Sequence, residues 1–564
     1  MRSFEILRFL ALTPLLALGF HAAGCGDDTQ TSSTSSGSSA SSGDVSSSSS
    51  SSSSGVGGSG GTAGSGGSGG SSMMFCMPGT MASCYSGPPA TKDIGLCKSG
   101  SWTCNAQGTA YGPCMGEVLP AAEDCSQPAD ENCNGASADC STGAWSKRFG
   151  DFDGQYGRSI GADSAGNIYI TGTFYSSIDF GAGAYSAMGL DGFLAKFDPT
   201  GSLLWSKQFG GDASQKPHSL AVDSLGNIVV TGGFSGTTDF GTGPLVATDG
   251  DIFVAKYDPD GKALWSKQFG AADSQYAEVI TLDAQNNVIL GSVFANSVDF
   301  GGGAFTTTNF GFALAKFDSG GNHIWSKAFN NDIGQPQLMV LSADGTGNIA
   351  FGGYFHGSVD FGGGVLTASA SYDMFLAKVN ANGEHLWSKR YGGALGQTPT
   401  GIGFDATGNL YAAGAFEGTI DFGGGVLTSA GDDDIWMAKL DADGNHIWSK
   451  RYGDGLQQFV TGLAVSKSGD LAIPITFAGT LNFGATSITS AGNLDMGHAR
   501  FDSAGNNLWS LRAGDSVSQS ADAVAFDPTG HLICTGELAG SADFGQGVLT
   551  SAGSADLYLL KLLP

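Results

Sequence analysis

Short segments in which apolar and polar residues alternate fill the chain from residue 144 to its end, and turn sequences separate them. Residues 192–197 show the pattern, and the turn Asp198-Pro199-Thr200-Gly201 follows them. A two-residue alternation predicts β-strands with one buried face, and Pro and Gly suit the turns between them. Further strands are expected at 203–209, 218–223 and 228–233. The pattern therefore predicts a run of short antiparallel strands.

The strands recur with a period near 60 residues, and two sequence markers define the period. The motif Trp-Ser-Lys or a degenerate copy recurs at Trp145, Trp205, Trp265, Trp325, Trp387, Trp448 and Trp509. Asp-Phe-Gly, or Asn-Phe-Gly in one copy, begins at Asp179, Asp239, Asp299, Asp360, Asp421, Asn482 and Asp543. Four strands repeated seven times predict an all-β fold, a seven-bladed β-propeller of four-stranded blades over residues 142–564. We expect each Trp to fill space between neighbouring blades.

The two ends of the repeat region complement each other. In each repeat a strand such as 192–197 precedes the strand that carries the Trp. Residues 144–149 form a Trp-containing strand without such a preceding strand, and residues 556–562 form a strand of that preceding kind without a Trp-containing strand after it. Pairing these two strands would complete the seventh blade and remove an exposed sheet edge. We therefore expect the first and last strands to pair.

These repeats resemble the bacterial seven-bladed β-propeller repeat family. The resemblance rests on units such as 251–257 with the turn Asp258-Pro259-Asp260-Gly261 and Trp265, and it covers residues 144–564. It implies the fold but no particular activity, because members of that family share none.

The N-terminal part predicts an exported, lipid-anchored protein. Residues 1–25 have basic residues around a short apolar run, as in an export signal. The sequence Ala22-Ala23-Gly24-Cys25 resembles the lipobox of bacterial lipoproteins, which implies acylation of Cys25 and anchoring in the outer membrane or cell surface of a Gram-negative bacterium. Residues 26–72 are mostly Ser and Gly and predict a disordered tether. An ordinary secretory signal with an incidental cysteine is the alternative.

Residues 73–141 hold eight cysteines, which predict a small domain stabilised by four disulfides. The sequence leaves their pairing open. They are Cys76, Cys84, Cys97, Cys104, Cys114, Cys125, Cys133 and Cys140.

One stretch of this domain could bind calcium. Residues 130–135 match the opening of a calcium loop, in which alternate oxygen ligands precede a turn at Gly135. The stretch also resembles a metal-binding motif of secreted Gram-negative proteins, through Glu123, Cys125, Asp130, Cys133, Gly135, Asp139 and Cys140. Position 141 is Ser where a calcium loop has Glu, so a plain disulfide-bonded turn is the alternative. The candidate ligands are Asp130, Asn132, Asn134 and Asp139.

Charge and the repeated residues argue against several functions. The formal net charge of −27 repels phosphate groups and predicts that nucleic acid is not a partner. Cys534 stands at an apolar strand position and is expected to be buried. The remaining polar candidates for a site are departures from the repeat at Glu417, Gln457, Gln458 and Glu537, whereas the copies of Asp-Phe-Gly and His323, His385 and His446 recur at equivalent positions and predict architecture.

We therefore expect a cell-surface lipoprotein, a monomer without a cofactor other than calcium, whose propeller binds an extracellular glycan or protein without catalysis. A rigid disc that displays many loops suits recognition. A structural or scaffolding protein is one alternative. A hydrolase or a quinoprotein-like oxidoreductase is another, and for the oxidoreductase the Asp-Pro-Thr-Gly turn and Trp205 resemble the Trp repeat of quinoprotein dehydrogenases. Binding predicts unrepeated aromatic residues on a loop face, and catalysis predicts unrepeated Asp, Glu or His converging on the centre.

Overall fold

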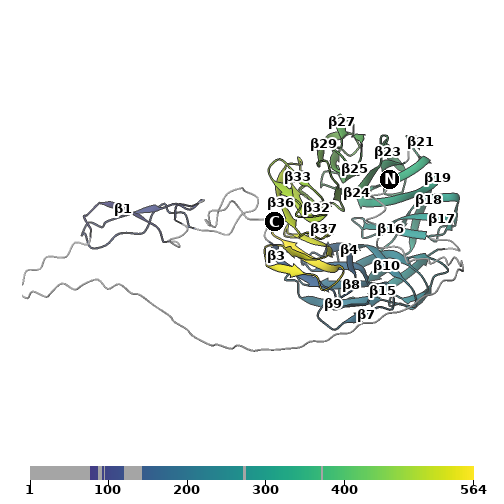
Figure 1. Cartoon of the computed structure of the whole chain (residues 1–564), viewed down its shortest axis with the longest axis horizontal. Helices are drawn as coiled ribbons and strands as arrows, with labels where there is room; N and C mark the ends of the chain where they lie inside the picture. The colour runs from purple at the N-terminus through teal and green to yellow at the C-terminus, as the bar shows by residue number, and fades with distance from the viewer. Residues whose placement is uncertain (1–75, 87–91, 95, 120–142, 271–274, 370–371) are drawn as a thin grey trace, which may run out of the picture. The chain divides into compact units, whose positions relative to one another are not determined.

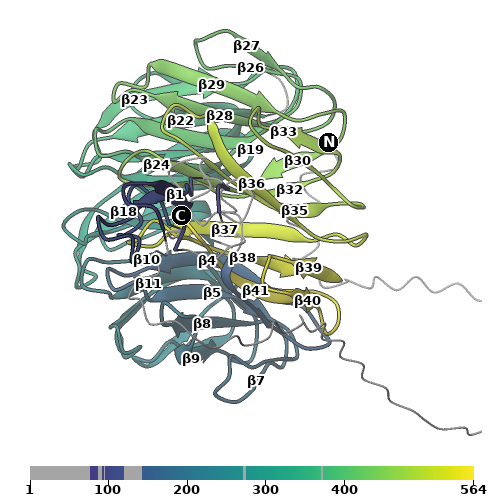
Figure 2. The ribbon, with the colours of Figure 1, turned by 90° about the vertical axis from the view of Figure 1, so that its left-hand side faces the viewer.

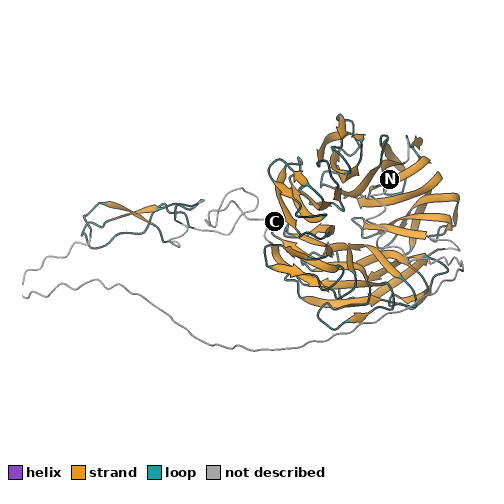
Figure 3. Cartoon of the chain, in the orientation of Figure 1, coloured by secondary structure: helices purple, strands orange, loops and turns teal. Residues whose placement is uncertain are grey.

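The computed structural model describes residues 76–86, 92–94, 96–119, 143–270, 275–369 and 372–564. These residues contain β-strands and no helix (Figure 3), so the all-β prediction is confirmed for them. The export signal, Cys25, the tether, Cys125, Cys133, Cys140 and the four candidate calcium ligands lie outside the described residues. Within the described part of the chain, no helix long and apolar enough to cross a membrane was found.

The described residues divide into two compact units, and the smaller contains residues 76–83 and 101–115. Strands β1 (Met81–Cys84) and β2 (Gly100–Thr103) form a two-stranded sheet. Cys76 is bonded to Cys104, and Cys84, Cys97 and Cys114 are also in disulfides. Every described cysteine of the cysteine-rich segment is thus in a disulfide, as the sequence predicts.

The larger unit comprises Cys84–Gly100 and Gly116–Pro564 and contains the repeats. Antiparallel sheets of four strands dominate it. Three have the orders β4-β5-β8-β9 (Gln155–Ala162, Ile168–Phe174, Asp191–Phe197, Leu203–Phe209), β10-β11-β14-β15 (Gln215–Val222, Ile228–Phe234, Asp251–Tyr257, Ala263–Phe269) and β24-β25-β28-β29 (Gln397–Phe404, Leu410–Phe416, Asp434–Leu440, His446–Tyr452). Figure 2 shows β4, β5, β8 and β9 succeeding one another across one sheet.

Two sheets depart from this plan. Strand β19 is continuous across two sets of strands and joins them into one eight-stranded sheet, with β21 (Val365–Thr367) at its side. That sheet has the order β16-β17-β18-β19-β20-β22-β23 (Gln275–Leu282, Val288–Val298, Phe305–Phe317, His323–Ala343, Ile349–Asp360, Asp373–Val379, His385–Tyr391). In the other, a break divides the first strand into β30 (Gln458–Val460) and β31 (Ala464–Val465), which both pair with β32 (Leu471–Phe477). Strands β35 (Asp495–Phe501) and β36 (Asn507–Ala513) complete it.

The first and last strands of the repeat region pair, as the sequence predicts. Strand β3 (Gly143–Phe149) is antiparallel to β41 (Asp556–Leu562) in the sheet β3-β41-β38-β37. The other two strands are β37 (Ser520–Phe526) and β38 (Leu532–Leu538). The sequence repeat described above begins with the strand before each Trp strand, whereas each sheet begins two strands earlier in the chain. The Trp strand is therefore the fourth strand of a sheet whose first two strands belong to the preceding sequence repeat.

The Asp-Phe-Gly segments are the turns of small hairpins. The Asp179 carboxylate accepts hydrogen bonds from the N–H groups of Gly181 (2.7 Å) and Gly183 (3.1 Å). Both glycines have φ above +100°, a conformation that an L side chain rarely adopts. The separate hairpins are β6–β7 (Ser177–Ile178, Tyr185–Ser186), β12–β13 (Thr237–Asp239, Pro244–Val246), β26–β27 (Thr419–Asp421, Val426–Thr428), β33–β34 (Thr480–Asn482, Ser487–Thr489) and β39–β40 (Ser541–Asp543, Val548–Thr550).

The sheets are arranged around a common centre, with first strands such as β4, β10, β16 and β24 toward it (Figure 1). Each first strand contacts the first strand of the next sheet, and β37 contacts β4. Six of the seven tryptophans donate a hydrogen bond from Nε1 to a carbonyl oxygen of the next repeat, as Trp205 does to Pro259 at 3.0 Å, whereas Nε1 of Trp509 has no such partner among the described residues. Apolar cores such as the cluster of Phe209, Phe240 and Phe253 fill the space between sheets.

Candidate functional site

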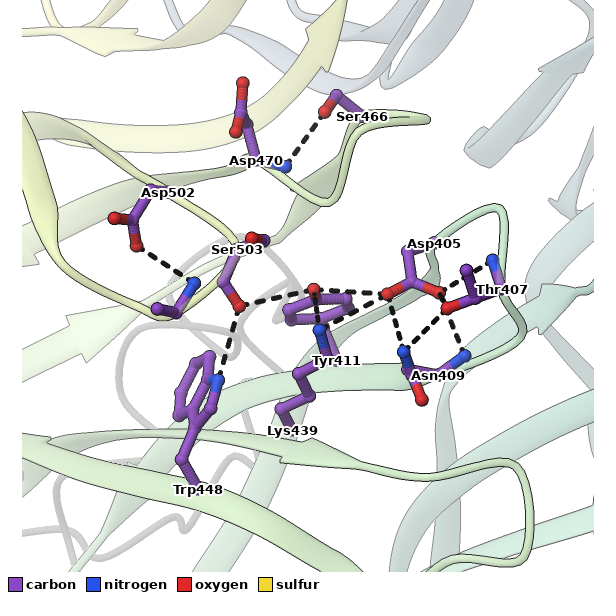
Figure 4. A network of polar contacts seen from close by, with 11 residues as sticks. Asp405, Thr407, Asn409, Tyr411, Lys439, Trp448, Ser466, Asp470, Asp502 and Ser503 are labelled. Atoms are coloured by element: carbon purple, nitrogen blue, oxygen red, sulfur yellow. Dashed lines mark hydrogen bonds and ion pairs between the residues drawn. The ribbon is translucent and has the colours of Figure 1, made fainter.

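Many of the polar residues that recur in each repeat belong to one network of hydrogen bonds and ion pairs (Figure 4). Asp405 directly follows β24, the first strand of its sheet. Its carboxylate accepts hydrogen bonds from the side chains of Thr407 and Asn409. Lys439 from the third strand lies 3.3 Å from the same carboxylate. Burial would raise the pKa of Asp405, but the hydrogen bonds from Thr407 and Asn409 outweigh it and hold the pKa well below its usual range. This network recurs around Asp163, Asp223, Asp283, Asp344 and Asp527, so it is structural.

One repeat carries an altered form of this network. Ser466 replaces the aspartate, and Asp470 stands where the other repeats have Asn or His. Arg500 replaces the lysine and pairs with Asp470 at 3.2 Å. The carboxylate has therefore moved by four positions and the lysine has become an arginine, and the ion pair is kept.

Unrepeated aromatic residues gather at β20 and at the start of β22. The rings of Tyr354 and Tyr372 are 4.9 Å apart, and His356 lies 5.8 Å from Tyr372 and 6.1 Å from Tyr354. All three side chains are partly exposed. The residues equivalent to Tyr354 in the other repeats are Thr173, Gly233, Val293, Ala415, Thr476 and Glu537. The cluster therefore belongs to one repeat only.

Two glycines allow these rings to approach the backbone. A Cβ at Gly334 would lie 2.8 Å from Cγ of His356, and one at Gly396 would lie 2.2 Å from the hydroxyl oxygen of Tyr372. The Gly396 carbonyl in turn accepts a hydrogen bond from the N–H of Glu417 at 3.0 Å. The Tyr372 side chain thus contacts the next repeat at Gly396, which is hydrogen-bonded to the backbone of Glu417.

In that next repeat the equivalent positions are acidic. Glu417 corresponds to His356, and Asp433 corresponds to Tyr372, because Phe355–Asp373 and Phe416–Asp434 are matching register pairs. Asp433 is only 8% exposed. Burial, with the charges of Glu417 and Asp432, raises the pKa of Asp433 to about 7. We call Tyr354, His356, Tyr372, Glu417 and Asp433 the aromatic–acidic surface.

A second set of unrepeated residues lies at a β-bulge in the first strands. The register shifts in β4, β10, β16, β19, β24 and β37 all occur at the same place, and the break between β30 and β31 falls at the equivalent position. A bulge re-aims the side chain of the extra residue. The residues at this position are Arg158, His218, Glu278, Met339, Thr400, Thr461 and Asp522.

The ionisable bulge residues stand on the four contiguous strands β37, β4, β10 and β16. Arg158 lies 3.9 Å from the carboxylate of Glu537 on β38, and its guanidinium lies 5.3 Å from the centre of the Tyr156 ring. Burial and the charge of Asp522 raise the pKa of Glu537, and Arg158 opposes them. Charged groups of both signs, Arg158, Glu537 and Asp522, thus lie close together at this bulge position.

The structure divides the candidate residues from the sequence into unrepeated ones and ones with a repeated structural role. Glu417 and Glu537 belong to the two unrepeated sets, whereas Gln458 donates hydrogen bonds to Asp454 and to the Ala478 carbonyl, as Gln519 does to equivalent partners. His323, His385 and His446 each contact a serine of their own strand and are not brought together. Cys534 is buried, and burial raises the pKa of its thiol.

Sequence reasoning missed the aromatic cluster and most of the bulge residues. Aligning the first strands on the aspartate that ends them would have found Arg158, His218 and Glu278, because the position five residues earlier differs in every repeat but two. No group of three metal-ligating side chains was found among the described residues.

Comparisons with known proteins agree with the repeat architecture. A β-propeller repeat family matches residues 144–173 and 204–232. An uncharacterized WD repeat-containing protein of Acanthamoeba polyphaga mimivirus is 21% identical over an alignment that covers 58% of this chain. The chain spans 31% of the length of that relative. The matched repeats and the sheets identify this chain as a β-propeller repeat protein.

Solved structures resemble the chain only distantly. An ulvan lyase of a polysaccharide lyase family is 14% identical with a TM-score of 0.41 and covers 72% of this chain and 97% of its own. The hydrazine synthase of Kuenenia stuttgartiensis is 11% identical with a TM-score of 0.35 and covers 70% of this chain and 96% of its own. Likenesses at this level carry no functional argument.

Proposed function

We propose that residues 142–564 form a seven-bladed β-propeller that binds an extracellular glycan at the aromatic–acidic surface without catalysis. The β3–β41 pairing and the succession of contacts from β4 round to β37 support seven blades in a closed ring. In this account the eight-stranded sheet is two blades that share β19. The export signal, the acylation of Cys25, the tether and a calcium ion held by Asp130, Asn132, Asn134 and Asp139 complete a monomeric cell-surface lipoprotein.

The observation that carries the proposal is the close approach of Tyr372 to Gly396, whose carbonyl accepts a hydrogen bond from the N–H of Glu417 in the next repeat. Aromatic rings present a large rigid apolar face, which suits the C–H face of a sugar ring. Carboxylates accept hydrogen bonds from hydroxyl groups. Glu417 could therefore fix the orientation of a sugar that stacks on the tyrosines, while the net charge of −27 disfavours nucleic acid.

A glycan array probed with the intact protein in detergent tests this proposal. We expect saturable binding to a limited set of glycans, and loss of that binding in Tyr354→Ala and Tyr372→Ala. Phe152→Ala is the matched control, because Phe152 is an exposed aromatic residue in another repeat (79% exposed). Equal binding by all three variants would reject the aromatic–acidic surface, and absence of binding to any glycan would favour a protein partner or a scaffolding role.

An enzyme is the second candidate, and Glu537 is the observation that favours it. A carboxyl group whose pKa is raised by burial and by a neighbouring carboxyl group suits a general acid. Hydrolysis of an array-positive glycan that is lost in Glu537→Gln would support this alternative over simple binding.

A further inference from the structure

Three basic side chains stand on two neighbouring first strands of an otherwise acidic protein. Arg158 belongs to β4, and Lys216 and His218 belong to β10. Strands β4 and β10 contact each other, and the Leu220 N–H donates to Oγ of Ser159 at 3.1 Å. This bond aligns the two strands, so Arg158 and His218 lie at nearly the same level. No other pair of adjacent first strands carries basic residues at these positions.

The three side chains also share an orientation on their strands. Lys216 and His218 are two positions apart and thus on one face of β10, as are Tyr156 and Arg158 on β4. Residues of this face are partly exposed, whereas Gln155, Gly157, Gln215 and Pro217 on the alternate face are buried. The basic groups therefore stand on the accessible face of both strands.

The side chains of Lys216 and Arg158 are still able to bind an anion. Among the residues that the structure describes, Lys216 has no hydrogen-bond or ion-pair partner, and burial lowers its pKa. The distance from Arg158 to the Glu537 carboxylate, 3.9 Å, is longer than a hydrogen bond, and the Arg158 side chain is 30% exposed. A half-buried lysine without a carboxylate partner is costly unless an anion compensates its charge.

We propose that Arg158, Lys216 and His218 form a binding site for an oxyanion group carried by a compact ligand, such as the carboxylate or sulfate of an acidic saccharide. The planar guanidinium offers paired donors that match an oxyanion, and the ammonium adds a point charge. Glu278 on β16 and Asp522 on β37 flank the basic strands, so they would confine the anion to β4 and β10. This site is separate from the aromatic–acidic surface, which lies on β20, β22 and β25 and the segments next to them.

Calorimetric titration of the intact protein with trigalacturonate, galactotriose, sulfate and phosphate tests the proposal. We expect trigalacturonate to bind and neutral galactotriose not to bind at this site; binding of sulfate or phosphate alone would identify a free inorganic ion as the ligand. Lys216→Met and Arg158→Met should each weaken anion binding by at least about tenfold, the effect of losing one charge-assisted hydrogen bond. Lys262→Met, which removes one exposed positive charge from a turn, should leave binding unchanged.

Further variants keep the test decisive. Lys216→Arg retains the charge and should bind within a few-fold of the wild type, so a folding defect in Lys216→Met would not hide the result. Tyr354→Ala should lose glycan binding at the aromatic–acidic surface but keep anion binding, which separates the two proposals. Absence of binding by every anion, or equal weakening by Lys216→Met and Lys262→Met, would overturn the assignment.

Discussion

Arg148 in β3 forms an ion pair with Asp556 in β41, although 408 positions separate them in the sequence. The Asp556 side chain is fully buried, whereas Arg148 is 29% exposed. Equivalent pairs join Asp373 to Arg390 and Asp434 to Arg451 within continuous stretches of chain. The same contact that holds two strands together elsewhere thus joins the two ends of the repeat region.

Loss of this pair should destabilise the repeat region. Arg148→Ala leaves the buried Asp556 carboxylate without its cation, and we expect the free energy of unfolding to fall by about 1–3 kcal/mol, less than for a fully buried pair because Arg148 is partly exposed. Arg148→Gln should lose less, because Gln208 serves the equivalent Asp191 at 2.6 Å. Denaturant unfolding of both variants measures the effect. Equal stability of Arg148→Ala and the wild type would show that the pair does not hold the ends together.

The altered network at Ser466 allows a compensation test. Asp470→Asn removes the partner of Arg500, whose side chain is 14% exposed, and should lower the free energy of unfolding by about 1–3 kcal/mol. The triple variant Ser466→Asp, Asp470→Asn, Arg500→Lys restores the arrangement of the other repeats and should recover most of that loss. Recovery is measured as the coupling energy between the substitutions. Purely additive losses of stability would show that the Asp470–Arg500 pair does not replace the aspartate–lysine pair of the other repeats.

Asp433 should make stability fall as pH rises. Its folded pKa of about 7 exceeds the ordinary value of 3.8, so the folded state holds a proton that the unfolded state releases between these two values. The stabilising contribution is complete below about pH 4 and is lost as pH rises through 7. Asp433→Asn should therefore gain stability over the wild type at pH 8 but not at pH 4. Asp249→Asn, at the exposed residue before Gly250 in another repeat, is the control and should show no such crossover.

His498 should have the opposite effect. It is fully buried at a position where the other repeats have Leu, Val or Met, and burial lowers its pKa from 6.5 to about 4. The unfolded state takes up a proton first, so stability falls as pH drops from about 6.5 to 4. His498→Leu should lose less stability than the wild type between pH 7.5 and 5 in urea unfolding. An identical loss in both proteins would mean that His498 does not titrate in this way.

The repeat architecture was predictable because each repeat presents the same alternation, turns and Trp. Even the β3–β41 pairing followed from an unpartnered strand at each end. The continuous strand β19 did not, because the sequence between Phe329 and Leu338 resembles a loop. The aromatic–acidic surface was beyond sequence reasoning for a similar reason: Tyr372 meets the backbone at Gly396 of the next repeat, and only packing between repeats brings them together.

Hydrogen–deuterium exchange with and without an array-positive glycan tests glycan binding at the aromatic–acidic surface. We expect protection from exchange in the peptides that contain Tyr354, His356, Tyr372 and Glu417, and loss of that protection in Tyr372→Ala. Protection confined to other repeats, or unchanged exchange at saturating glycan, would contradict binding at the aromatic–acidic surface.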